Sequence, residues 1–375
     1  MSTLMRRFSG TTLVFLAMAI VMGWQPSVAQ TPKCAVGVNV NSFQNFSPTD
    51  QQAIVEQLKR SGVAFVRTSL RPDDKNMSLA KSLQSAGIGL VLVTGARFAP
   101  NAPLRPADEK RHMRSAMPLS YADPESSRTY FQTVFDQLDK KGVVLAGVEL
   151  DNEINWTDFN GDFPVPGQGK SFNLEDLSRD PEAQKVAQGF LQYLKVLAAL
   201  KEVRDHSRLN PHAPIISAGM AGATGGQWQQ NLKVDSVSIP ATYAFLRAHG
   251  LDNLVDGYGV HDYPPVVKPG DKTAAAQRIA MLDNLIFPPG NTKPYWLTEW
   301  GFPSAATSSA QDQDQDQDRA RSVAEMRAYF LHLFQQGRLA GMFWYVWNEP
   351  DRDSIYRSGA LMEAGRQAVA PMPVH

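Results

Sequence analysis

The chain has 375 residues, of which 37 are Lys or Arg and 37 are Asp or Glu, so its formal net charge at pH 7 is zero. This balance excludes the strongly basic surface that binds nucleic acid or anionic membranes, and we expect neither as a partner. Cys34 is the only cysteine, which excludes an intrachain disulfide. We expect this cysteine to be structural or incidental.

The N-terminal segment has the order of features that is typical of a secretory signal peptide. Arg6 and Arg7 precede the apolar run Thr11–Gly23, and the small-residue triplet Ser27–Ala29 follows. An uncleaved membrane anchor is the alternative, but the run is shorter than the roughly 20 residues that a spanning helix needs. We therefore predict a signal peptide over 1–29, cleaved at its end, and one domain over 30–375. The mature protein is expected to be a secreted or periplasmic monomer.

Short apolar segments alternate with longer amphipathic ones along the mature chain. Eight apolar segments are predicted strands: Val36–Val40, Ala64–Leu70, Gly89–Thr94, Val144–Leu150, Pro214–Gly219, Val255–Val260, Pro294–Thr298 and Met342–Val346. The helices predicted after them are Gln51–Arg60, Met77–Ala86, Arg128–Lys140, Glu182–Arg204, Ile239–His249, Thr273–Leu285, Asp318–Gln336 and a short final helix within Ser358–Ala370. This alternation predicts an α/β fold with parallel strands, and eight strands predict a single-domain (β/α)8 TIM barrel.

Three connections in this pattern are unusually long: Gly95–Ser127, Ile154–Pro181 and Pro303–Gln317. All three follow the C-terminal end of a predicted strand, where barrel enzymes place their active sites. Within the last one, Gln311–Asp318 alternates Gln and Asp. Such a polar repeat predicts a solvated loop or a frayed helix start, without a chemical role.

Two glutamates lie where predicted strands end. Glu153 follows the fourth strand and Glu299 ends the seventh, and these strands face each other across the mouth of an eight-stranded barrel. Opposed carboxyl groups suit the cleavage of a glycosidic bond, because one must be protonated to release the leaving oxygen. The other must be ionised to attack the anomeric carbon.

Around these glutamates the chain resembles clan A of the glycoside hydrolases, and families 5 and 39 in particular. Asn152-Glu153 matches the acid/base pair of the clan, and Trp296–Gly301 matches its nucleophile strand, in which a glutamate precedes an aromatic residue and a glycine. His261-Asp262-Tyr263, after the sixth strand, matches the His-x-Tyr of many members. The chain departs from the cellulase-like pattern at Ile154, where those families have proline, and at Arg97-Phe98, where they often have a histidine.

The resemblance implies a role for each matching residue. Glu153 would be the acid/base and Glu299 the nucleophile of a retaining double displacement. Tyr263 would donate a hydrogen bond to the nucleophile, His261 would line the subsite, and Arg67 would hold the nucleophile ionised.

The resemblance also implies contacts with the sugar. Asn152 would hydrogen-bond the 2-hydroxyl of the reacting sugar, and Trp347 would form an aromatic floor beneath it. Four further aromatic residues either stack on sugar rings or pack the loops: Trp156, Phe159, Phe163 and Trp300.

Three other acidic residues near the strand ends are interpreted as bystanders. Trp347-Asn348-Glu349-Pro350 looks like an acid/base motif, but the nucleophile would then have to lie about three strands later, and 26 residues follow Glu349. Asp151 is expected to point away from Asn152 by strand alternation. Glu149 is expected to lie deeper, paired to a cation.

The function that we predict is retaining hydrolysis of β-glycosidic bonds in a polysaccharide or oligosaccharide. No cofactor or metal is expected, because the seven histidines are scattered without metal-site spacing. An inactive carbohydrate-binding barrel and a transglycosylase with the same residues are the alternatives. Four arginines in the third-strand loop indicate either an acidic or phosphate-bearing polysaccharide or a solvated basic face: Arg97, Arg105, Arg111 and Arg114.

Overall fold

The computed structural model describes residues 34–222, 225–267, 270–302, 311–347, 354–357 and 359–373, and only the backbone of 311–316. The predicted signal peptide, Glu349 and most of the loop 303–317 lie outside the described residues. Among the described helices, none has the length and hydropathy of a membrane-spanning segment.

Eight parallel strands form one sheet in the order β6-β4-β3-β2-β1-β10-β9-β8. Their bounds are β1 Ala35–Asn39, β2 Phe65–Ser69, β3 Gly89–Thr94, β4 Gly147–Leu150, β6 Ile215–Ile216, β8 Tyr258–Asp262, β9 Tyr295–Trp300 and β10 Leu339–Trp344. The first and last strands pair with each other. Two parallel bridges, Ile216 with Gly257 and Met220 with Val260, join the two ends of the sheet. The predicted (β/α)8 barrel is therefore confirmed.

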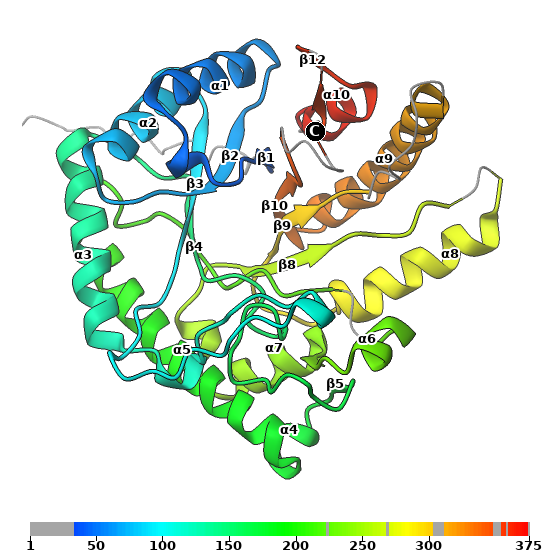
Figure 1. Cartoon of the computed structure of the whole chain (residues 1–375). Helices are drawn as coiled ribbons and strands as arrows, with labels where there is room; N and C mark the ends of the chain where they lie inside the picture. The colour runs from blue at the N-terminus through cyan, green and yellow to red at the C-terminus, as the bar shows by residue number, and fades with distance from the viewer. Residues whose placement is uncertain are drawn as a thin grey trace, which may run out of the picture. The chain divides into compact units, whose positions relative to one another are not determined.

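Helices lie between successive strands and surround them (Figure 1). They are α1 Pro48–Arg60, α2 Asp74–Ser85, α3 Pro124–Lys141, α5 Pro181–His206, α7 Ile239–Ala248, α8 Lys272–Met281, α9 Gln311–Gln335 and α10 Glu363–Val369. Three of them start with the same local chemistry, a capping Ser or Asp followed by proline at the first helical position. The cap accepts an orphan backbone N–H, and the proline has no N–H to satisfy.

The N-terminal end of the barrel is filled by aromatic side chains. Trp296 of β9 stacks on Phe343 of β10, with ring centroids 6.4 Å apart. The indole fits because the neighbouring strands have glycines beside it: a Cβ at Gly341 or Gly257 would lie 2.4 Å from a ring atom. The interior is therefore a packed core, as in other barrels of this size.

Two of the long loops have structure of their own. In the loop after β3, three antiparallel bridges fold the segment back on itself between Phe98 and Ala122, and it contains the short helices η2 Glu109–Arg111 and η3 Leu119–Tyr121. In the loop after β4, β5 Ser171–Phe172 pairs with β7 Ser236–Val237, and the turn α4 Asp176–Arg179 follows.

Several strands and helices begin or end at residues other than those predicted. The sixth and seventh strands extend two residues further than predicted, so that His261 and Glu299 are strand residues. The fifth strand shrinks to Ile215–Ile216. Helix α10 is shorter than predicted because the residues before it form the hairpin β11 Tyr356–Arg357 and β12 Ala360–Leu361. The other described elements are α6 Gln227–Leu232, η1 Phe43–Asn45, η4 Leu251–Asn253 and η5 Leu282–Ile286.

Candidate active site

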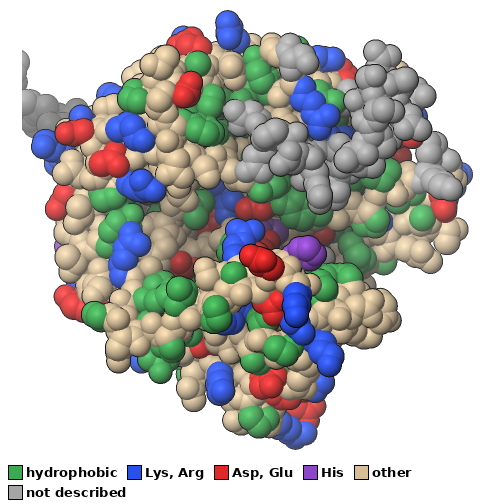
Figure 2. Space-filling view, in the orientation of Figure 1, with side chains coloured by type: hydrophobic (Ala, Val, Ile, Leu, Met, Phe, Trp, Pro, Cys, Tyr) green, Lys and Arg blue, Asp and Glu red, His purple; other side chains and the backbone are tan. Residues whose placement is uncertain are grey.

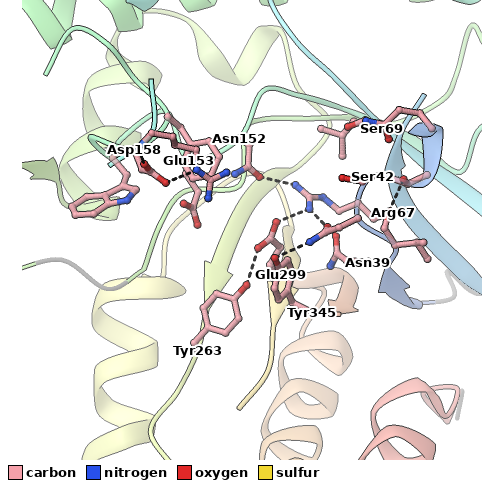
Figure 3. A pocket seen from close by; sticks show the side chains of 18 residues that line it. Asn39, Ser42, Arg67, Ser69, Asn152, Glu153, Asp158, Tyr263, Glu299 and Tyr345 are labelled. Atoms are coloured by element: carbon pink, nitrogen blue, oxygen red, sulfur yellow. Dashed lines mark hydrogen bonds and ion pairs between the residues drawn. The ribbon is translucent and has the colours of Figure 1, made fainter. Parts of the chain in front are cut away.

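Arg67, on β2, lies at the centre of a hydrogen-bonded network at the C-terminal end of the barrel (Figure 3). Its Nε donates to Glu149 at 2.5 Å and its Nη1 to Glu299 at 2.8 Å. Nη1 also donates to Asn39 Oδ1, and Nη2 to Asn152 Oδ1, at 2.8 and 3.0 Å. Burial favours the neutral form, but the two carboxylates outweigh it and raise the pKa of Arg67 above its ordinary value. The guanidinium is a fixed buried cation.

Glu299 is held as a carboxylate by three neighbours. Besides Arg67, the hydroxyl of Tyr263 donates to its Oε2 at 2.7 Å, and His261 Nδ1 lies 3.6 Å from the same oxygen. Burial works to raise the pKa of Glu299, but the charges of His261 and Arg67 and the Tyr263 hydrogen bond lower it below its ordinary value. Glu299 is therefore ionised at neutral pH, which is the state that a nucleophile needs.

Glu153 lies opposite Glu299 and follows the end of β4. Its backbone has a left-handed φ of 44°, and its N–H donates to Gly219 O at 2.9 Å. The carboxyl group is hydrogen-bonded to His261 Nδ1 at 2.8 Å. This imidazole contacts both glutamates, because a register shift between β8 and β9 after Val260 pairs His261 with Glu299.

The three groups are close together. Each of Glu153, His261 and Glu299 offers a carboxylate oxygen or ring nitrogen within 4.8 Å of the others. Such a trio could hold a divalent cation. Glu299 and Glu153 raise the pKa of the buried His261 in spite of its desolvation. The same three groups are also suited to acid–base and nucleophilic chemistry on a bound molecule.

A cleft of about 670 Å³ opens above these groups. Figure 2 shows a hollow near the middle of this face, with acidic and basic side chains around it. The described residues that line the cleft include five of the predicted site residues: Arg67, Asn152, Glu153, Tyr263 and Glu299. His261 is fully buried and does not line the cleft itself, but it contacts the two glutamates that do. The structure therefore brings six of the eight predicted residues together.

Trp300 and Trp347 are the exceptions, and their predicted contact with substrate is corrected. Both indoles are fully buried. Trp300 packs edge-on against Trp344, because strand alternation turns it away from the interior that Glu299 faces. Trp347 stacks on Tyr356 at 4.7 Å. Phe163 is also buried, whereas Trp156 and Phe159 line the cleft.

Several lining residues were not predicted. Asn39 ends β1 and accepts from Arg67. Tyr345 follows β10, lines the cleft, and accepts a hydrogen bond of 2.7 Å from Asn41. Their positions at the ends of the first and last strands were a signal that the sequence offered. Arg114, one of the four loop arginines noted in the sequence, and Asp158, which no local pattern indicated, also line the cleft from two different loops.

The two bystander acids lie as expected. Glu149 is fully buried beneath the cleft, where it pairs with Arg67 and accepts from the backbone N–H of Gly219 and the hydroxyl of Thr298. Asp151 faces a neighbouring cavity rather than this cleft. Its Oδ1 accepts from Ala96 N.

Comparisons with known proteins find solved structures of similar fold. No family model and no curated protein matches the sequence. Among solved structures, virulence factor SghA from Agrobacterium tumefaciens matches with a TM-score of 0.51 and 12% identity, over 90% of this chain and 96% of that one. The endocellulase from Pyrococcus horikoshii matches with a TM-score of 0.49 and 13% identity, over 90% and 92%. A GH39 enzyme from Xanthomonas axonopodis pv. citri matches with a TM-score of 0.48 and 13% identity, over 90% and 65%.

At these identities the likeness is one of fold. The chain has the (β/α)8 barrel of these structures.

Proposed function

We propose that this protein is a retaining β-glycoside hydrolase, with Glu299 as nucleophile and Glu153 as acid/base. The observation that supports this most directly is the closeness of the two carboxyl groups: one oxygen of each lies within 4.8 Å of an oxygen of the other. Retaining enzymes place the two carboxyl groups about 5–5.5 Å apart, whereas inverting enzymes leave about 6.5–9.5 Å for a water molecule. A closest approach of this size is in keeping with the retaining arrangement.

In the first step, Glu299 attacks the anomeric carbon while the bond from that carbon to the leaving oxygen breaks. Glu153 gives its proton to the leaving oxygen. In the second step, Glu153 takes a proton from water, and the resulting hydroxide displaces Glu299 from the anomeric carbon. Two inversions give net retention. Arg67 and Tyr263 keep Glu299 ionised before the attack and stabilise it again as it departs.

Asn152 is suited to hold the reacting sugar. A guanidinium only donates hydrogen bonds, so the amide atom that faces Arg67 is Oδ1. The amide Nδ2 is then available to donate into the cleft, in accord with the expected contact to the 2-hydroxyl. His261 is a positioning residue, because its hydrogen bond fixes the carboxyl of Glu153.

The test is Glu299→Ala, measured by release of reducing ends from β-linked polysaccharides and of phenol from aryl β-glycosides. We expect turnover to be abolished, and azide to restore it partly with formation of the α-glycosyl azide. Glu153→Ala should lose about 10²–10⁴-fold for poor leaving groups and much less for activated aryl glycosides. Glu56→Ala, at an exposed site on α1, is the matched control.

Two outcomes would contradict the proposal. Full activity of Glu299→Ala would exclude it as nucleophile. An α-anomer as the first product of a β-glycoside, followed by proton NMR, would exclude retention. Sugar-capped products found by mass spectrometry would identify the transglycosylase alternative, which uses the same residues.

We also propose that the chain is exported and matures by cleavage after Ala29, acting as a monomer. The basic, apolar and small-residue order of the first 29 residues supports export. Sequencing the N-terminus of the protein from the extracellular or periplasmic fraction, with light scattering of the purified product, tests both statements.

A further inference from the structure

A second cavity of about 600 Å³ adjoins the cleft, between the ends of β2, β3 and β4. The two cavities share lining residues, among them Ser69, Asn152, Asp158 and Phe159, so one continuous ligand can occupy both. Its volume lies within the range of small-molecule sites, about 300–1,000 Å³. On the proposed function, the sugar next to the reacting one would bind here.

Three arginines border this second cavity: Arg71, Arg97 and Arg114. The structure thereby separates the four arginines of the loop after β3. Arg97 and Arg114 face the cavity, whereas Arg105 donates to the backbone carbonyl of Thr157 at 2.7 Å, and Arg111 pairs with its neighbour Asp108. Arg71, from the loop after β2, joins the set.

Two of the three arginines keep their charge uncompensated by any ion pair among the described residues. The guanidinium carbon of Arg97 lies over the ring of Tyr130, 3.4 Å from its centroid. This cation–π contact holds the guanidinium in place. Arg71 donates to the neutral amide oxygen of Asn45 at 2.9 Å. Both arginines are exposed at the rim. A planar guanidinium so held suits a carboxylate, which it binds with paired hydrogen bonds.

Two acidic groups line the cavity with these arginines. Asp158 is bound to Arg114, whose Nε lies 2.8 Å from its Oδ2. Asp151 has an Oδ2 that is buried without a hydrogen-bond partner among the described residues. Burial raises the pKa of Asp151 to about 6, against the hydrogen bond from Ala96 N–H and the charge of Arg97. Within the described residues, neither acid forms an ion pair with Arg71 or Arg97.

Apolar side chains complete the cavity. Phe98, Met117 and Phe159 line it beside the polar groups. The cavity thus offers an apolar face for the ring of a sugar and two rim cations for a charged substituent.

We propose that the second cavity binds a hexuronate residue, so that the substrate is an acidic polysaccharide whose carboxylate pairs with Arg71 and Arg97 one sugar away from the scissile bond. This inference rests on the proposed function and names its substrate class.

The experiment compares acidic polymers with their carboxyl-reduced forms, in which each uronate becomes the neutral sugar of the same linkage. Poly-β-mannuronate, β-1,4-glucuronan and hyaluronan are the probes, and reducing ends are measured with the mature protein. We expect kcat/KM for at least one acidic polymer to exceed that of its reduced form about 10–100-fold, the value of one or two hydrogen bonds between charged groups. The double variant Arg71→Gln/Arg97→Gln should lose this preference for the acidic polymer. Arg60→Gln, at an exposed site on α1 that lines neither cavity, should keep it.

Binding provides a second measurement, independent of turnover and of the fold of the double variant. Calorimetry with the inactive Glu299→Gln chain should show that hexuronate oligosaccharides bind more tightly than reduced ones, and that added salt removes the difference. Equal rates or affinities for acidic and reduced forms would overturn the inference, as would cleavage of neutral or sulfated polymers alone. In those cases the proposed function still stands if Glu299→Ala is inactive.

Discussion

Replacing Tyr263 by phenylalanine isolates one contact of the proposed nucleophile. The variant removes a hydroxyl that donates to Glu299 at 2.7 Å and leaves the ring in place. A hydrogen bond to a charged group contributes about 1.5–3 kcal/mol. Tyr263 is 36% exposed, so we take the lower part of this range, about 1.5–2 kcal/mol. Since one pKa unit corresponds to about 1.4 kcal/mol, the pKa of Glu299 should rise by about one unit.

The sign of the effect follows from the direction of the shift. Glu299 must be ionised to attack, and its pKa lies below the ordinary value of 4.5, so the acid limb of kcat/KM in the parent lies below pH 4.5. In Tyr263→Phe this limb should move to higher pH by about one unit. The rate well above both pKa values should change much less.

The assay is the pH dependence of kcat/KM with an aryl β-glycoside. Tyr258→Phe is the matched control, because this tyrosine starts β8, the strand that Tyr263 follows, and donates to Asp252, away from the cleft. An acid limb that stays in place in Tyr263→Phe, or that moves equally in Tyr258→Phe, would refute the reasoning.

Two other substitutions test the residues that hold the candidate active site in place. Gly219→Ala would place a Cβ 2.0 Å from Nε2 of His261; displacement of the ring by about 1 Å should lower kcat about 100-fold, and an unchanged kcat would show that the ring does not position the acid/base. Arg67→Leu removes the cation that two buried carboxylates share, so denaturant unfolding should show a loss of about 3–5 kcal/mol. Because the pKa of Glu299 is lowered in the folded state, its share of stability is present above pH 4.5 and is lost as pH falls through the folded value. The deficit of Arg67→Leu should therefore shrink in acid, and a constant deficit would contradict it.

Strand order made the placement of the two glutamates predictable from sequence. Glu153 and Glu299 were identified by their places at the ends of the fourth and seventh strands, and the structure brings their carboxyl groups together. Arg67 was predicted from the family resemblance, and the structure places it between Glu149 and Glu299. Such residues are positioned by the period of two along a strand and by the order of strands around the barrel.

Errors arose where a strand end was misplaced or the period was not applied. The last strand ends at Trp344 rather than Val346, so Tyr345 occupies the place given to Trp347. Trp300 follows Glu299 directly and must face the opposite side. The loop residues were beyond local rules, since Asp158 meets Arg114 across 44 residues of chain, and only the folded loops bring them together.

The aromatic side chains that fill the N-terminal end of the barrel limit how the candidate active site at the other end can reach solvent. Trp296 and Phe343, with Val91 and Ile216 packed beside them, fill the interior, so the reacting centre communicates with solvent through its mouth. On the proposed mechanism, the water that releases the covalent sugar would enter by the opening through which the leaving group departs. A second sugar that enters by the same opening would compete with that water. The ratio of hydrolysis to transglycosylation would then depend on whether water or a second sugar enters the mouth of the barrel first.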